Sequence, residues 1–144
     1  MACTRIVLVT GVCFGLLLGA PVAPAKAGIL WDEWDEVFLW AHPAGGAFCH
    51  AMARFALKEV KQKPDQKEKI TRGLESTCRG MIKARTPKGT PATLLGEDVN
   101  MLRVKVGEGA SSGAEGYVSK EVYYESYEER AQKTLSAPAS TPPK

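Results

Sequence analysis

The sequence is poor in the side chains that most often perform catalysis or bind metals. Its two histidines, His42 and His50, lack the i, i+4 spacing that places two ligands together on a helix. Cys49 precedes His50, but covalent haem attachment needs the pattern C-x-x-C-H, which is absent. No G-x-S-x-G motif occurs, and the glycine-rich segment 107–116 lacks the helix start of a phosphate-binding loop. The sequence therefore predicts no catalytic residue, no metal site and no cofactor, and hence a protein that is not an enzyme.

The chain also lacks a strong excess of either charge once its first 27 residues are set aside. Arg5 and Lys26 account for two of the 19 basic residues, which leaves 17 against 16 acidic ones. Proteins that bind nucleic acid or anionic membranes usually carry a marked basic excess. The composition therefore gives little reason to predict nucleic acid or a membrane surface as a partner.

A long hydrophobic run is found near the N-terminus. The segment Ile6–Ala20 has no charged residue and follows Arg5, an arrangement typical of a secretory signal peptide. Pro21 and Pro24 interrupt the run of about 20 apolar residues that a membrane anchor would need. Cys13 lies too early for a lipoprotein signal. These features favour a cleaved signal over either alternative.

Small residues at Ala25 and Ala27 provide a site for signal peptidase. We expect residues 1–27 to be removed, with cleavage after Ala25 or after Ala20 as alternatives. The mature chain is then periplasmic or secreted and keeps no stable membrane span.

Cysteine is scarce in the expected mature chain. Cys3 and Cys13 belong to the predicted signal, so Cys49 and Cys78 remain. An even pair in an exported chain predicts a disulfide. Two free thiols or a functional thiol pair are the alternatives, although no C-x-x-C motif is present.

Three segments after the signal show the apolar spacing of three and four residues that is typical of helices. They are Gly28–Ala41, about Ala47–Gln62 and about Gln66–Met81. Cys49 lies 15 residues before Pro64 and Cys78 lies 14 after it. Because a helix rises about 1.5 Å per residue, an antiparallel hairpin that turns at Pro64 places both cysteines at nearly the same height. This arrangement can satisfy the Cα separation of about 4.4–6.8 Å that a disulfide requires.

The first of these segments contains all three tryptophans. Trp31 and Trp34 lie on its apolar stripe and are expected in the core. Trp40 lies off the stripe and is expected to be the most exposed of the three. As an alternative, Trp31, Trp34 and Trp40 form a surface that docks on a partner.

The pattern changes from helices to strands after Ala84. Met101–Val106 alternates apolar and polar residues, as a half-buried strand does. Shorter apolar segments predict strands at 92–95, 115–118 and 122–124. A helix from about 125 to 135 and a disordered tail rich in Ser, Ala, Thr and Pro complete the expected chain.

The stretches Lys88–Leu95, Leu102–Val106 and Glu115–Lys120 occur in the order typical of the second half of a bacterial SH3-like domain, which this part of the chain resembles. The resemblance implies a small SH3-like β-barrel over residues 84–124. The expected fold class is therefore α+β. A helical segment over 28–83, with its disulfide-linked hairpin, precedes the barrel, and residues 125–144 form the short helix and tail.

SH3-like barrels typically hold extended peptides or cell-wall segments with aromatic side chains around their loops. The resemblance therefore implies Tyr117, Tyr123, Tyr124 and Tyr127 as possible ligand-binding residues. As an alternative, Tyr117 and one of the Tyr123/Tyr124 pair belong to the core.

The expected function is an exported, non-catalytic binding protein of the cell envelope. It would engage a partner protein or a peptidoglycan-type ligand through the SH3-like module. The alternative is a structural or accessory subunit of an envelope complex that docks through its tryptophan-rich first helix.

Overall fold

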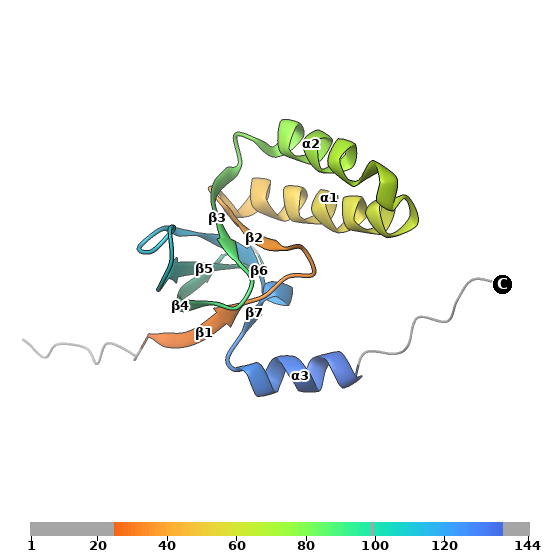
Figure 1. The fold of residues 1–144 in the computed structure, drawn as a ribbon. Helices are drawn as coiled ribbons and strands as arrows, with labels where there is room; N and C mark the ends of the chain where they lie inside the picture. Colours follow the sequence, from red (N-terminus) through yellow and green to blue (C-terminus); the bar gives the residue numbers. More distant parts are fainter. Residues whose placement is uncertain (1–24, 99, 137–144) are drawn as a thin grey trace, which may run out of the picture.

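A computed structural model describes residues 25–98 and 100–136 of the chain. Within these residues, seven strands form one antiparallel sheet in the order β3-β2-β6-β5-β4-β1-β7, accompanied by a helical hairpin and a C-terminal helix (Figure 1). The strands are β1 (Lys26–Leu30), β2 (Glu36–Trp40), β3 (Ile82–Pro87), β4 (Thr90–Asp98), β5 (Met101–Val106), β6 (Glu115–Ser119) and β7 (Tyr123–Tyr124). The helices are α1 (Pro43–Gln62), α2 (Lys67–Cys78) and α3 (Tyr127–Ser136), with the short 3₁₀ helices η1 (Pro64–Gln66) and η2 (Lys120–Val122). The fold is α+β.

Most of the predicted signal peptide and most of the predicted tail fall on residues 1–24 and 137–144, outside the described residues. The predicted helix before the tail is present as α3.

Strands β1 and β2 occupy the segment Gly28–Ala41, so the prediction of a first helix there is wrong. β1 pairs with β4 and β7, and β2 pairs with β3 and β6. On β2, Val37 and Leu39 belong to one buried cluster, whereas Phe38 and Trp40 belong to another. A strand buried on both faces has a continuous apolar run in place of an alternation. Its spacing then happens to fit a helix as well.

The second and third predicted helices are confirmed as α1 and α2. α1 starts at Pro43, four residues before the expected start, and α2 ends at Cys78, three residues before the expected end. The predicted disulfide joins Cys49 to Cys78, with Cα atoms 5.9 Å apart. The hairpin connects β2 to β3, which are neighbours in the sheet (Figure 1). The hairpin is therefore an insertion between two paired strands of one sheet. The domain boundary predicted between residues 83 and 84 lies inside β3.

The core consists of two buried clusters on opposite faces of β2. The inner cluster is formed by sheet residues and η2: Leu30, Val37, Leu39, Ala92, Leu102, Val104, Val106, Val118, Val122 and Tyr123. The hairpin cluster lies between the sheet and the two helices: Trp34, Phe38, Trp40, Cys49, Ala53, Ala56, Leu57, Leu74, Cys78 and Met101. Since β2 contributes to both clusters, it holds the hairpin and the sheet together as one unit.

The strands predicted in the second half of the chain are present as β4, β5, β6 and β7, and β5 has the predicted bounds. In β5 the buried residues Leu102, Val104 and Val106 alternate with two exposed cations, as the period of two requires. Gly116 lets β6 approach β2 closely, because a Cβ at this position would lie 2.9 Å from the Cβ of Leu39. Where closure into a small barrel was expected, the described strands form an open sheet with β3 and β7 at its edges.

Candidate ligand-binding cleft

A cleft lies beside β7 and is bounded by the loop after β1, by the middle of α3 and by one side of α1. Its volume is about 640 Å³, within the range of roughly 300–1,000 Å³ that small-molecule and peptide sites occupy. Its lining combines aromatic rings with charged side chains of both signs: Trp31, Asp32, Glu33, Arg54, Lys120, Glu121, Val122, Tyr124, Arg130, Lys133 and Thr134. We refer to it below as the Trp31 cleft.

Backbone hydrogen bonds hold the walls of the Trp31 cleft in place. The amide of Trp31 donates to the carbonyl of Val122 at 2.8 Å, which continues the pairing of β1 with β7. On the other side, the amide of Gly89 donates to the carbonyl of Leu30 at 2.6 Å. Gly89 has a φ of +86°, a conformation that glycine adopts far more readily than other residues. The loop that presents Trp31 is therefore held by η2 on one side and by the turn between β3 and β4 on the other.

The aromatic rings of the Trp31 cleft are covered by cations from α3. The guanidinium carbon of Arg130 lies 3.7 Å from the ring centroid of Trp31, and the ammonium of Lys133 lies 5.0 Å from that of Tyr124. The ring of Tyr127 meets Trp31 edge-on at 6.5 Å, and its hydroxyl donates to the carbonyl of Gly89 at 3.2 Å. Cations at these distances from aromatic faces are attracted by the ring quadrupole. Two aromatic faces of the cleft are therefore already in contact with cationic side chains of the same chain.

The opposite wall is an ion cluster centred on Arg54 of α1. Its guanidinium lies 3.6 Å from Asp32, 3.2 Å from Glu33 and 3.9 Å from Glu121. Burial raises the pKa of the Asp32 carboxyl, although Arg54 and a hydrogen bond from the amide of Glu33 oppose the shift. A hydrogen bond from Lys61 lowers the pKa of the Glu33 carboxyl, and Arg54 adds to this shift. Arg54 therefore links the buried carboxyl of Asp32 to the solvent-exposed carboxylates of Glu33 and Glu121.

The lining consists mainly of charged side chains and aromatic faces. Thr134 is the one aliphatic hydroxyl among the residues that line the cleft, and it donates to the carbonyl of Arg130 within α3. His50 lies behind the lining, with its Nε2 atom 3.5 Å from a carboxylate oxygen of Glu121. Within the described residues, no three His, Cys, Asp or Glu side chains gather closely enough to hold a metal ion. Charged side chains beside aromatic faces are suited to binding a ligand.

The four tyrosines singled out from the sequence are divided between core and surface. Tyr123 is buried in the inner cluster, and its hydroxyl donates to the carbonyl of Lys26 at 3.2 Å. Tyr117 is half-buried and packs against the hairpin cluster. Tyr124 lines the Trp31 cleft, and Tyr127 lies beside it with 54% of its surface exposed. Two of the four therefore lie at the candidate site.

The three tryptophans do not form one docking surface. Trp34 and Trp40 are buried in the hairpin cluster, and Trp40 is only 2% exposed, so the prediction that it is the most exposed tryptophan is wrong. Its ring stacks on Phe38 at 5.5 Å within β2. The prediction that Trp31 lies in the core is also wrong, because Trp31 is half-buried and lines the cleft. The proposed docking helix is absent because this segment forms β1 and β2.

The charged half of the site was not predicted. Arg54, Arg130 and Lys133 stand at ordinary polar positions of helices, where a solvent-facing cation is the usual interpretation. A partial signal was available, because Tyr127 and Arg130 are three residues apart and so share a helix face. Nothing in the sequence placed that face over Trp31, which lies 99 positions before Arg130.

No protein-family model matches the chain, and no curated protein or solved structure is significantly similar to it. None of the helices in the described part of the chain is both long and apolar enough to cross a membrane.

Proposed function

We propose that this chain is an exported, non-catalytic binding protein of the cell envelope, and that the Trp31 cleft is its ligand site. The observation that carries the proposal is the pairing of Trp31 and Tyr124 with the cations Arg130 and Lys133 across one open cleft. The ligand would be an extended segment of a partner protein or of wall material. The resemblance of residues 84–124 to bacterial SH3-like domains supports the same type of ligand.

The chemistry of the cleft favours an extended ligand that carries carboxylates. Arg130 and Lys133 can turn from the aromatic rings to carboxylates of the ligand, and the rings then receive its apolar parts. α3 can shift to admit such a ligand, because none of its residues is buried. Segments with few buried contacts open at a low cost in free energy.

Trp31→Ala is expected to weaken retention of the protein on its ligand by about fivefold or more, since truncation of a buried aromatic anchor typically costs about 1 kcal/mol or more. Arg130→Ala is expected to act in the same direction. Retention is measured by co-sedimentation with purified peptidoglycan and by pull-down from an envelope extract.

Leu95→Ala is the control, because Leu95 is an exposed apolar residue on β4 that lines neither the cleft nor the hairpin face. It should bind as the unaltered protein does. Equal retention of Trp31→Ala and the unaltered protein would remove the cleft from the proposal. Failure of both preparations to retain the unaltered protein would contradict the proposed function itself.

The disulfide and the start of β1 support export of the chain and suggest where its signal is removed. Lys26 and Ala27 pair with Leu94 and Thr93 of β4, and Lys26 also forms an ion pair with Glu125. Cleavage after Ala27 would remove these two residues from a five-residue strand. Cleavage after Ala25 keeps the whole strand and uses small residues at Ala23 and Ala25.

We therefore expect the exported protein to begin at Lys26. Intact-mass measurement of protein recovered from the periplasm or the medium tests this directly. A mature form that begins at Gly28 would contradict the choice of site, and an intact Met1 would contradict cleavage altogether.

A further inference from the structure

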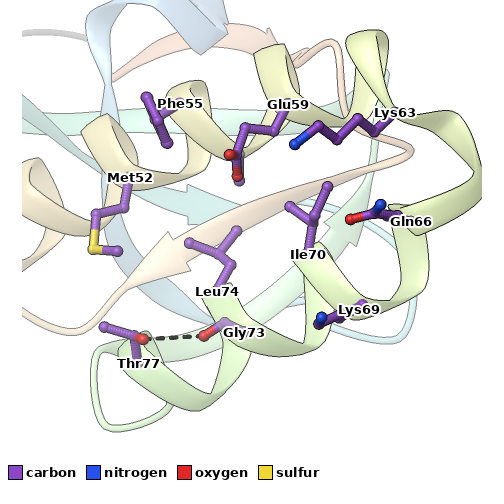
Figure 2. Close-up of a pocket in the computed structure, with 11 residues that line it drawn as sticks. Met52, Phe55, Glu59, Lys63, Gln66, Lys69, Ile70, Gly73, Leu74 and Thr77 are labelled. Carbon is purple, nitrogen blue, oxygen red and sulfur yellow. Dashed lines mark hydrogen bonds between the residues drawn. The ribbon is translucent and has the colours of Figure 1, made fainter.

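The outer face of the helical hairpin exposes large apolar side chains to solvent. A groove of about 380 Å³ runs between α1 and α2. Figure 2 shows Met52 and Phe55 of α1 facing Ile70 and Leu74 of α2 across this groove. Phe55 is 65% exposed, and Phe48, two turns before it on the same side of α1, is 62% exposed.

A helix on the surface of a small domain normally keeps one apolar stripe towards the core and a polar face outward. α1 already has such a stripe, since Cys49, Ala53 and Ala56 pack into the hairpin cluster. Phe48, Phe55 and the partly buried Met52 between them form a second stripe at i, i+4 and i+7. Within the described residues, Met52 packs against the hairpin cluster, whereas Phe48 and Phe55 remain largely exposed.

The charge of the hairpin differs from that of the rest of the chain. Residues 43–79 contain eight basic and four acidic side chains, a net charge of +4, while the other residues of 26–144 contain ten and twelve, a net charge of −2. The net charge of the whole chain is small, but the positive charge is concentrated on the hairpin. Lys58, Lys63 and Lys69 are exposed, and none has a carboxylate within 4.0 Å in the part of the chain that the structure describes. Lys63 and Lys69 line the groove itself, together with one carboxylate, that of Glu59.

We propose that the outer face of the hairpin binds the surface of an anionic lipid membrane. Phe48 and Phe55 enter the boundary between headgroups and acyl chains, and Lys58, Lys63 and Lys69 contact the anionic headgroups. Apolar side chains flanked by lysines are the combination by which surface-lying helices bind such membranes. A second copy of the chain is a poorer occupant, because the contact would bring two hairpins of charge +4 together. This inference uses none of the residues of the Trp31 cleft.

The proposal is tested by co-sedimentation of the exported form with lipid vesicles. One set of vesicles is pure phosphatidylcholine, and the other contains equal parts of phosphatidylcholine and phosphatidylglycerol. Binding is expected to the anionic vesicles and to weaken in high salt, where charge attraction is screened. The triple change of Lys58, Lys63 and Lys69 to Gln is expected to reduce affinity on the order of a hundredfold, since each lysine contributes about fivefold.

The apolar contribution is tested by the double variant Phe48→Ser and Phe55→Ser, for which a loss of about tenfold or more is expected. Its matched control is Leu135→Ser, which removes another exposed apolar side chain, 86% exposed, from α3. Because these residues are exposed, all variants should keep the far-ultraviolet circular dichroism of the unaltered protein. Equal binding to both kinds of vesicle, or an unaltered affinity of the phenylalanine variant, would overturn the proposal. So would a dimer in light scattering that the phenylalanine variant converts to a monomer, because the face would then bind a second copy.

Discussion

Replacing both Cys49 and Cys78 with alanine is expected to lower the free energy of unfolding by about 3–4 kcal/mol, the loop-closure value for a cross-link spanning 29 positions. The cross-link joins α1 to α2 near the end of the hairpin that attaches to β2 and β3. Without it, the unfolded chain gains the conformations that the closed loop excluded. The hairpin also loses two buried sulfur atoms from its cluster.

This loss should appear as a decrease in melting temperature of about 10–20 °C for a domain of this size. Thermal unfolding is followed by circular dichroism with and without a reducing agent. The reducing agent should destabilise the unaltered protein and leave the double alanine variant unchanged, which serves as the internal control. An unaltered melting temperature in the double variant would show that the bridge contributes little to stability.

Trp40→Ala is expected to be the most damaging single aromatic substitution, with a loss of about 3–5 kcal/mol. The side chain is 2% exposed and stacks on Phe38. The first turn of α1 packs directly on it, because a Cβ at Gly46 would lie 2.6 Å from the Cβ of Trp40. Removal of the indole leaves a cavity at the junction of the sheet and the hairpin. Since domains of this size are stable by about 5–15 kcal/mol, the variant should be partly unfolded at moderate temperature.

Trp31→Ala is the matched comparison, because it removes the same side chain from a half-buried position in the cleft. Its cost in stability should be about 1 kcal/mol, the size of an exposed cation–π contact. Urea denaturation of both variants, followed by circular dichroism, measures the difference. Equal losses in the two variants would contradict the assignment of Trp40 to the core and Trp31 to the site.

The hairpin could be predicted from the sequence because its determinants are local. The apolar stripes of α1 and α2, the turn at Pro64 and the matching heights of Cys49 and Cys78 all lie within one stretch of chain. β5 could also be predicted from the sequence. Arg103 and Lys105 alternate with three buried apolar residues, and this period of two is typical of a strand and not of a helix.

The segment Gly28–Ala41 could not be predicted in the same way. β2 is a strand because it pairs with β3, which follows it only after the whole hairpin, and with β6. Burial of Val37 and Leu39 on one face and of Phe38 and Trp40 on the other removes the alternation that identifies a half-buried strand. The local spacing was then compatible with a helix, and distant pairing decided between the two.

The Trp31 cleft depended on distant pairing even more strongly. Tyr124 and Trp31 come together because β1 pairs with β7, with Ile29 opposite Tyr124. The assignment of Tyr123 to the core and Tyr124 to the cleft follows from the alternation of side chains in a strand, once the strand is known. Because Tyr123 and Tyr124 are adjacent in the sequence, a strand places them on opposite faces. The sequence alone did not show which of the two faces outward.

The pairing of β1 with β7 also has a consequence for the order in which the chain folds. β1 lies between β4 and β7 in the sheet, so one edge of β1 remains unpaired until residues 123–124 are available. Contacts that join the two ends of a chain form late, because the intervening segment must be ordered first. A chain that enters a new compartment N-terminus first would therefore stay incompletely folded until nearly all of it has arrived. The strand that directly follows the expected cleavage site would then be among the last to be secured.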